Sequence, residues 1–405
     1  MKMEEWKEYE LSELIDEISM GPFGSNIKVE CFTDSGVPVL NGSNLVGLKL
    51  NEDKFNYVTE EKAASLGKSN AYRNDIVITH RGTLGQIVYI PQDSKYEHYV
   101  ISQSQFRVKC NQKVLPEYLV YYFHTRIGQH QLLSNASQVG VPALARPTTT
   151  FQKLRIVLPP LANQQKIARI LSSLDDKIEL NNKINANLEE QAQALFKNWF
   201  VDKYDKDGVI GDYCTVKSGF AFKSAWWQDK GIKVIRIGDI EQGCLSLETC
   251  AHVTNDKTDI AKDFLVHGGD LVIAMTGATI GKFSMIPKTQ EPILVNQRVG
   301  KFFLGDNPIE KVPFIYCTLK QEEVITEFIN RGQGSAQPNI STGDILSIPC
   351  WIPSDNEIDN FNKTIQPMFE TIISNQEENR KLSGLRDSLL PKLMSDEIEV
   401  GEVII

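Results

Sequence analysis

The sequence predicts an α+β protein with two similar globular domains separated by two long helices that form an antiparallel coiled coil, an internal pseudo-two-fold repeat. Three observations predict this fold class. Short apolar runs bounded by Gly, Pro, Asn or Asp are typical of strands, the second half of the chain repeats the first, and two segments place apolar residues at alternating spacings of four and three. With 405 residues, of which 41% are hydrophobic and 23% charged, the chain is long enough for two or three domains.

The repeat consists of five pairs of segments that occur in the same order in both halves. Residues 37–45 match residues 232–240 in apolar pattern at an offset of 195, the difference between 232 and 37. The other pairs keep offsets between 194 and 196: 74–82 with 269–277, 101–103 with 295–297, Pro142 with Pro338, and 151–159 with 345–353. Because chance does not explain such colinear matches, we predict two copies of one domain-plus-helix unit.

The globular parts combine strand-like and helical patterns. Apolar runs at 75–78, 87–90, 234–237 and 271–275 predict strands, whereas residues 116–130 and 312–330 carry helical spacing. Each globular part is therefore expected to be an α+β domain with a substantial sheet. We predict globular domains at 1–160 and 206–353, helices within 161–205 and 354–396, and an acidic tail at 397–405.

The two helical segments each carry a coiled-coil seam with asparagines in its middle. The first seam comprises Ile167, Leu171, Leu174, Ile178, Asn181, Asn185, Leu188, Leu195 and Trp199. The second comprises Phe361, Ile365, Ile372, Asn375, Asn379, Leu382, Leu389 and Leu393. Buried polar pairs specify register, so we expect an antiparallel pair in which Asn181 faces Asn379 and Asn185 faces Asn375.

That register makes further predictions about the seam. It places Trp199 against Phe361 and sets Leu174 against the charged Arg386, whose neighbour Leu385 could take its place. The 33 residues from Ile167 to Trp199 would extend ~50 Å at ~1.5 Å per residue. The helices are therefore expected to act as a spacer between the globular domains.

Charge and composition limit the function classes. The net charge of −9 argues against nucleic acid, but residues 101–160 hold seven Lys or Arg and one acid, which is a candidate basic patch. No apolar run approaches the ~18 residues of a membrane span, and the acidic N-terminus is unlike a secretory signal, so we expect a cytoplasmic protein. The seven cysteines lack a Cys-x-x-Cys pair, and we expect no metal site.

Two motif tests argue against chemistry in this chain. Residues 277–282 are one residue short of a phosphate-binding loop and are followed by Phe283 where Ser or Thr should bind magnesium, so a turn between strands is the expected structure. An Asn-Pro-Pro-Tyr-like or Asp-Pro-Pro-Tyr-like methyltransferase motif is also absent from the sequence. We therefore expect no catalytic residues and no cofactor in this chain.

The helical segments carry a family resemblance. Residues 158–171, with Pro-Pro-Leu and Asn-Gln-Gln, and residues 174–184, with Asp-Lys-Ile-Glu-Leu-Asn, resemble the central conserved region of type I restriction-modification specificity subunits. Residues 188–200 continue this likeness, and residues 382–394 resemble the second conserved region. Residues 21–25 and 218–224 also look familial, so the resemblance covers essentially the whole chain.

The resemblance implies a non-catalytic DNA-binding subunit. Two target-recognition domains would each read one half of a bipartite double-stranded DNA target, and the helices would set the gap between the halves. Two modification subunits would dock on the helices and bring S-adenosylmethionine, and restriction subunits that use ATP and Mg would then join. The alternatives are a two-module protein-interaction scaffold with a coiled-coil spacer and a free-standing methyltransferase or nuclease.

Candidate DNA-binding residues follow from the repeat and from charge. Base readout uses Arg or Lys for guanine, Asn or Gln for adenine, and Ser or Thr for either. Polar positions in the matched segments are the candidates for base contacts: Asn41, Ser43, Arg81, Ser102, Gln103, Arg236, Thr276, Asn296 and Gln297. Phosphate candidates rest on charge alone: Lys28, Arg107, Arg146, Lys223, Lys282, Arg298 and Arg331. Trp226 and Trp227 are expected to pack in a core rather than to form a wedge between bases.

Overall fold

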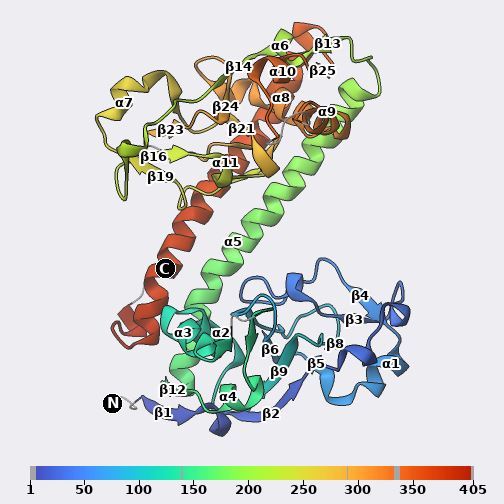
Figure 1. The fold of residues 1–405 in the computed structure, drawn as a ribbon, viewed down its shortest axis with the longest axis vertical. Helices are drawn as coiled ribbons and strands as arrows, with labels where there is room; N and C mark the ends of the chain where they lie inside the picture. The colour runs from blue at the N-terminus through green and yellow to red at the C-terminus, as the bar shows by residue number, and fades with distance from the viewer. Residues whose placement is uncertain (1–5, 138–139, 290, 333–337, 403–405) are drawn as a thin grey trace. The chain divides into compact units, whose positions relative to one another are not determined.

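The computed structural model describes residues 6–137, 140–289, 291–332 and 338–402. The chain forms two compact units: unit 1 comprises residues 1–175 and 384–405, and unit 2 comprises residues 176–383. The chain therefore passes from one unit to the other inside two long helices, α5 (Leu161–Phe196) and α11 (Asp355–Met394) (Figure 1). Each unit contains one globular part and one segment of each long helix.

Unit 1 contains two sheets. The first has the strand order β2-β9-β6-β7 and is antiparallel, and the second has the order β4-β3-β8-β5 with β3 and β8 parallel. Their bounds are β2 Ile15–Met20, β3 Val37–Val39, β4 Asn56–Val58, β5 Asn70–Tyr72, β6 Ile76–Thr79, β7 Ile87–Tyr89, β8 His98–Val100 and β9 Gln105–Cys110. The remaining elements of this globular part are β1 Lys7–Glu10, β10 Ala136–Ser137, β11 Ala143–Leu144, β12 Arg155–Leu158, α1 Glu60–Ser65, α2 Pro116–His124, α3 Arg126–Leu133 and α4 Pro147–Gln152.

Unit 2 repeats this topology. Its sheets have the orders β14-β24-β21-β22 and β15-β19-β16-β23-β20, in which β16 and β23 are the parallel pair and β15 is an added edge strand. Their bounds are β14 Thr215–Ser218, β15 Trp227–Gln228, β16 Ile232–Ile235, β19 Ala251–Val253, β20 Leu265–Val266, β21 Leu271–Ala274, β22 Phe283–Met285, β23 Ile293–Val295 and β24 Val299–Phe303. The other elements are β13 Gly208–Val209, β17 Ile240–Glu241, β18 Cys244–Leu245, β25 Pro349–Cys350, α6 Ile210–Tyr213, α7 Lys257–Ile260, α8 Val312–Leu319, α9 Glu322–Gly332 and α10 Thr342–Leu346. The predicted α+β repeat is confirmed.

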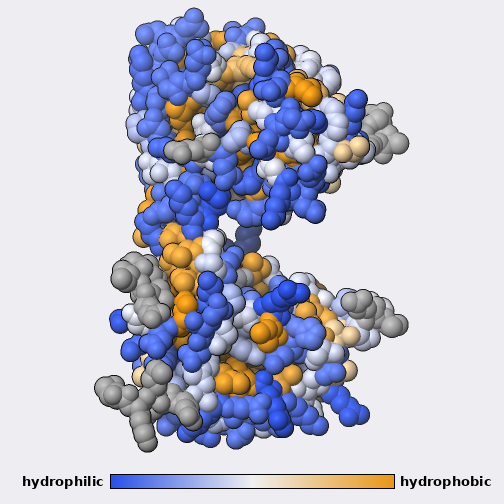
Figure 2. Space-filling view, turned by 90° about the vertical axis from the view of Figure 1, so that its left-hand side faces the viewer, coloured by the Kyte–Doolittle hydropathy of each residue, from blue (hydrophilic) through white to orange (hydrophobic). Residues whose placement is uncertain are grey.

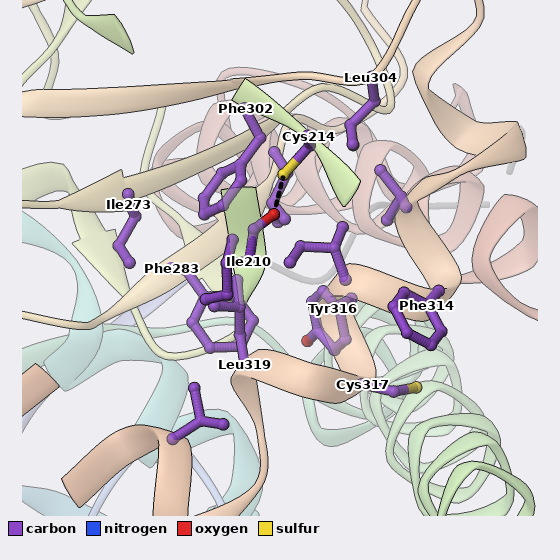
Figure 3. Close-up of a cluster of buried hydrophobic side chains, with 14 of the residues drawn as sticks. Ile210, Cys214, Ile273, Phe283, Phe302, Leu304, Phe314, Tyr316, Cys317 and Leu319 are labelled. Carbon is purple, nitrogen blue, oxygen red and sulfur yellow. Dashed lines mark hydrogen bonds between the residues drawn. The ribbon is translucent and has the colours of Figure 1, made fainter. Parts of the chain in front are cut away.

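In unit 2 the first sheet packs on α8. Figure 3 shows Ile273, Phe283 and Phe302 of this sheet beside Phe314 and Tyr316 of α8. The rings of Phe283 and Tyr316 lie 5.1 Å apart, edge to face, an arrangement that stabilises aromatic pairs beyond their burial. The turn that follows β21 is a short 3-10 segment, Gly277–Thr279, as expected for the loop that only resembles a phosphate-binding motif.

Equivalent tyrosines attach each globular part to α5. In unit 1 the Tyr121 hydroxyl donates to Asp175 Oδ2 at 2.6 Å. In unit 2 the Tyr316 hydroxyl donates to Glu189 Oε1 at 3.0 Å. The two tyrosines are 195 residues apart and occupy equivalent positions, but their acceptors do not, because Asp175 and Glu189 both lie on α5.

The asparagine pairs of the seam form as predicted. Within unit 2, Asn181 Nδ2 donates to Asn379 Oδ1 at 2.9 Å, and Asn375 Nδ2 donates to Asn185 Oδ1 at 2.8 Å. The rings of Trp199 and Phe361 lie 5.6 Å apart. These contacts confirm the antiparallel register, because a shift by one heptad in either direction would break both asparagine pairs and leave most of the amides facing apolar side chains.

One detail of the seam prediction is wrong. Within unit 1, Leu385 does not take the seam position of Arg386, because the side chain of Leu385 is 42% exposed. Instead, Arg386 Nη1 donates to Asp175 Oδ1 at 2.7 Å, while Leu174 beside it is buried. The guanidinium is tolerated at the seam because a carboxylate on the facing helix neutralises it.

The surface is predominantly polar. Hydrophilic residues cover most of the face drawn in Figure 2, and hydrophobic residues form separate areas among them. Within the described ranges, we find no helix with the length and apolarity that crossing a membrane requires.

Candidate nucleic-acid interface

In unit 1, three loops are joined by backbone hydrogen bonds at the end of strand β6. The His80 N–H donates to the carbonyl of Ser104 at 2.9 Å, and the Leu144 N–H donates to the carbonyl of His80 at 2.8 Å. The Gly82 N–H donates to the carbonyl of Pro142 at 2.9 Å. Segments 80–86, 101–104 and 140–146 thus lie side by side, and we call them the loop frame of unit 1.

Unit 2 builds the same frame from segments 275–282, 296–298 and 338–342. The Met275 N–H donates to the carbonyl of Arg298 at 3.0 Å, and the Ile340 N–H donates to the carbonyl of Met275 at 2.9 Å. The Gly277 N–H donates to the carbonyl of Pro338 at 2.9 Å. Bond for bond, the backbone arrangement is that of unit 1.

A glycine holds a further segment against each frame. A Cβ atom on Gly21 would lie 1.8 Å from the carbonyl oxygen of Ser102, and one on Gly219 would lie 2.3 Å from that of Val295. Both distances are too short for any other residue, so only glycine permits this close approach. The two familial motifs, which begin near these glycines, are therefore structural parts of the frame.

The frame of unit 1 also contacts the loop after β3. Gln86 Nε2 donates to the carbonyl of Gly42 at 2.9 Å. Asn41 caps the short 3-10 turn Gly42–Asn44 by accepting from the backbone N–H of Ser43 at 2.8 Å. The predicted residues Asn41, Ser43, Arg81, Ser102 and Gln103 therefore belong to adjoining loops, and all five are exposed or half-buried.

His80 occupies the centre of this frame. Its Nε2 lies 3.1 Å from the carbonyl oxygen of Gln103, so this nitrogen carries the proton and donates. Burial lowers the pKa of His80 below its ordinary value, which keeps the ring neutral. The imidazole therefore stabilises the frame as a neutral donor rather than as a cation for phosphate.

In unit 2 the frame contains a cleft of about 580 Å³. Three predicted residues, Thr276, Gln297 and Arg298, line it. Arg298 and Gln297 are exposed, whereas Thr276 Oγ1 is buried and meets no hydrogen-bond partner among the described residues. The cleft therefore presents exposed donors from Gln297 and Arg298, as expected of a surface that hydrogen-bonds a ligand.

Asn296 belongs to the same turn, but it also forms hydrogen bonds within the protein. Its side-chain oxygen lies 3.4 Å from the backbone N–H of Arg298, and its backbone N–H donates to Ile235 at 2.9 Å. Its side chain is half-buried. Asn296 therefore helps to shape the turn that presents Gln297 and Arg298.

The structure contradicts the expectation for Arg107. Its side chain is 4% exposed and forms ion pairs with Asp75 at 3.0 Å and Glu17 at 3.1 Å. It also donates to the carbonyl of Lys68 at 2.8 Å. A guanidinium in the core cannot contact phosphate, and charge alone gave no sign of its burial.

Most other candidate cations of unit 2 have protein partners. Lys282 pairs with Glu241, Arg236 lies 3.7 Å from Asp239 and donates to Thr249, and Lys223 lies over the ring of Trp226 at 5.4 Å. Arg331 binds Glu327, Asp344 and Ser347, and so ties α9 to α10. These four are placed to stabilise the fold. In unit 1, by contrast, Lys28, Arg81 and Arg146 are exposed, and their side chains meet no partner among the described residues.

The two tryptophans lie where the sequence predicted them, at the edge of a core. Trp226 stacks on Phe220 at 6.1 Å, and Trp227 contacts Phe222 at 5.5 Å. Both are half-buried and pack on the core around β16 and β19. The structure therefore gives no support to a wedge between bases.

The sequence prediction missed Ser218, Asn339 and Thr342, which also line the cleft of unit 2. A signal for two of them was available. Because Pro142 pairs with Pro338, the positions after these prolines are equivalent, and Ala143 differs from Asn339 as Arg146 differs from Thr342. The same test that selected Arg81 and Thr276 would have selected them.

Comparison with known families places both halves of the chain in one class. The family described as Type I restriction modification DNA specificity domain matches residues 3–190 and again residues 206–383. Each match contains one loop frame and begins before the first strand of its globular part.

Curated relatives and a solved structure agree with this match. The chain is similar to the specificity subunit of type I restriction enzyme MjaIX of Methanocaldococcus jannaschii, with 28% identity over 72% of this chain and 71% of the relative. It is also similar to the HindI specificity subunit of Haemophilus influenzae, with 24% identity over 98% of this chain and 100% of the relative. A crystal structure of a type I restriction-modification S subunit from M. genitalium shares the fold, with a TM-score of 0.57, 17% identity, and coverage of 97% of this chain and 96% of that chain.

Proposed function

The chain belongs to the family of type I restriction-modification DNA specificity proteins, and from this premise we propose that its two loop frames read the two halves of a bipartite DNA target. It is the specificity subunit of a type I system and has two recognition domains. As a member of this class it serves as a targeting subunit, and the chemistry resides in its partners.

The observation that carries this proposal is one backbone frame built twice with different side chains. Arg81 in unit 1 stands where unit 2 has Thr276, and Ser104 stands where unit 2 has Arg298. Different donors and acceptors at equivalent positions suit two readers of unlike sequences, because base identity is read by side-chain hydrogen bonds. A protein that bound the same ligand twice would need no such divergence.

Exchange of one globular part tests the assignment. Replacing residues 206–353 by the corresponding residues of another family member should change one half of the methylated motif and leave the other half intact. The motif can be read from the host genome by methylation-aware sequencing. Replacement of residues 1–160 is the matched control and should change the other half. A change in both halves, or in neither, from either exchange would show that the frames are not independent readers.

We also propose that two modification subunits dock on the long helices. Leu180 and Ile184 of α5 lie one helical turn apart and are 52% and 38% exposed, outside the seam. Apolar side chains that neither the seam nor a core uses are typical of a surface that a partner covers. The partners would supply S-adenosylmethionine and adenine methylation, and restriction subunits that use ATP and Mg would complete the assembly.

Co-purification tests this docking. A chain with Leu180→Glu and Ile184→Glu should lose most of the modification subunit that copurifies with it, because two charges replace the apolar contact. The exposed Ala186 on the same helix provides the control, since Ala186→Glu adds a charge on a face of the helix turned away from the pair. Equal recovery of the partner with the wild-type, doubly substituted and control chains would remove Leu180 and Ile184 from the docking surface.

A further inference from the structure

We propose that Arg81 in unit 1 and Arg298 in unit 2 each read a guanine, from different loops of the same frame. This inference rests on the proposed function and names the residues that determine specificity within it. Arg81 follows strand β6, and Arg298 lies in the turn before strand β24. The two arginines therefore occupy non-equivalent positions of equivalent frames.

The guanidinium groups of Arg81 and Arg298 are both available to a ligand. Both side chains are exposed, and neither has an ion pair, hydrogen bond or ring contact with another described side chain. Among the five candidate cations of unit 2, Arg298 differs in this respect from Lys223, Arg236, Lys282 and Arg331. An arginine left unpaired at a polar cleft keeps its five N–H donors for a ligand.

The backbones of the two arginines are fixed in their frames. The carbonyl of Arg298 accepts the hydrogen bond that anchors the loop after β21, so its backbone is held while its side chain stays free. Arg81 is bridged to Ala143 on the neighbouring loop in the same manner. Fixed backbones reduce the entropy lost when a side chain is ordered against a base.

The positions of the two arginines favour contacts with bases over contacts with phosphates. The phosphate backbone is the same for every sequence, so two copies of one frame should contact it with the same residue types at equivalent positions. Arginine instead exchanges places: unit 1 has Arg81 and Ser104, whereas unit 2 has Thr276 and Arg298 at those positions. A change of this kind alters which base is read. The bidentate partner of arginine in the major groove is guanine, through O6 and N7.

The surroundings of Arg298 fit a base edge. Gln297 beside it is exposed, and Thr276 and Asn339 line the same cleft of about 580 Å³. Donors of several types around one arginine suit recognition of adjacent bases better than neutralisation of one phosphate.

The test is the motif methylated by the complete chain with its modification subunits, measured for wild type, Arg298→Ser and Arg298→Lys. Serine is the residue of unit 1 at this position, and lysine keeps the charge without the planar fork. With serine, one guanine in one half-site should lose its preference by roughly 5- to 150-fold, the range for a bidentate contact, and the other half should be unchanged. Lysine should retain part of the preference. Arg81→Thr should have the same effect in the other half-site.

Four outcomes would overturn the inference while leaving the proposed function intact. These are a wild-type half-site without any guanine on either strand, an unchanged motif in Arg298→Ser, an equal loss of methylation at all sites, and equal behaviour of serine and lysine. An equal loss at all sites would identify a phosphate contact. If the wild-type complex instead methylates no bipartite motif, the proposed function itself fails, and this inference fails with it.

Discussion

Arg107 lies in the core of unit 1, where its guanidinium meets the carboxylates of Asp75 and Glu17. Asp75 is itself 3% exposed and also accepts from the backbone N–H of Tyr72 at 2.9 Å. Burial raises the pKa of Asp75, and the Arg107 charge opposes that shift. The pair joins β9 to the start of β6, one of the strands that lead into the loop frame.

Replacing Arg107 by Met should therefore destabilise unit 1 by about 3–5 kcal/mol, because the substitution leaves a buried carboxylate without its counter-charge. Amide hydrogen exchange in β6 and β9 measures this loss locally. The exposed Lys109→Met on the same strand is the matched control and should change exchange little. A stability loss no larger than that of the control would mean that the ion pair is energetically neutral. The methylated motif should stay the same, since the side chain of Arg107 is buried.

His124 makes the stability of unit 1 depend on pH. Burial lowers the pKa of His124, whose Nε2 lies 3.0 Å from the carbonyl oxygen of Ile87. Since the unfolded chain binds a proton near pH 6.5 and the folded chain binds it only at lower pH, stability falls as pH drops below about 6.5 and levels off below the folded pKa. His124→Gln keeps an amide donor and should remove a slope of at most about 1.4 kcal/mol per pH unit. Urea unfolding of both chains between pH 7.5 and 5.5 measures the difference, and parallel slopes would contradict it.

At the scale of single elements, the seam was accessible from sequence because its signal is local. The seam positions of α5 and α11 are spaced by three or four residues, and the two asparagine pairs leave one antiparallel register. The ion pair between Arg386 and Asp175 could not be predicted from the spacing, because Asp175 is adjacent to the seam rather than in it. Periodicity identifies which face is buried, but it does not identify the neighbour that neutralises a charge.

The sequence predicted that sheets are present, but it did not predict the order of their strands. Short apolar runs predicted strands at β6, β7, β16 and β21, but the order β2-β9-β6-β7 depends on pairings between residues far apart in the chain. The candidate site shares this limit. Matched segments with unlike residues indicated Thr276, whereas the burial of Arg107 follows from tertiary packing that no segment reveals.

The asparagine pairs give a testable prediction at this scale. Asn185→Leu alone should destabilise the helix pair by about 0.5–1.5 kcal/mol, because the half-buried amide of Asn375 loses its hydrogen-bond partner. Adding Asn375→Leu should recover that stability or exceed it, since two apolar side chains then meet. A thermal-unfolding cycle of wild type, both single variants and the double variant measures the coupling, and Asn187→Leu is the control because it makes the same substitution at an exposed position of α5. Additive losses in the cycle would mean that the two amides do not interact.

At the scale of the whole molecule, the duplication is unequal in a way that suits an asymmetric target. The helices keep their seam and the frames keep their backbone hydrogen bonds, while the side chains on the frames differ. In the second sheet, unit 2 has the two-residue edge strand β15 where unit 1 has the single bridge Thr33–Tyr57. A common scaffold with two different sets of donors is what reading two unlike half-sites in one DNA molecule requires.

The chain passes between its units at 175–176 and 383–384, both within helices, so helix length should set the gap between the half-sites. Inserting seven residues at each point preserves the heptad and the asparagine pairs, and lengthens the helices by ~10 Å. At ~3.4 Å per base pair, the unspecified gap in the methylated motif should widen by about three base pairs, with both half-sites unchanged. Inserting seven residues into α5 alone is the control, and it should abolish methylation because the seam loses its register. If the doubly lengthened chain methylates the original motif, the helices do not determine the spacing.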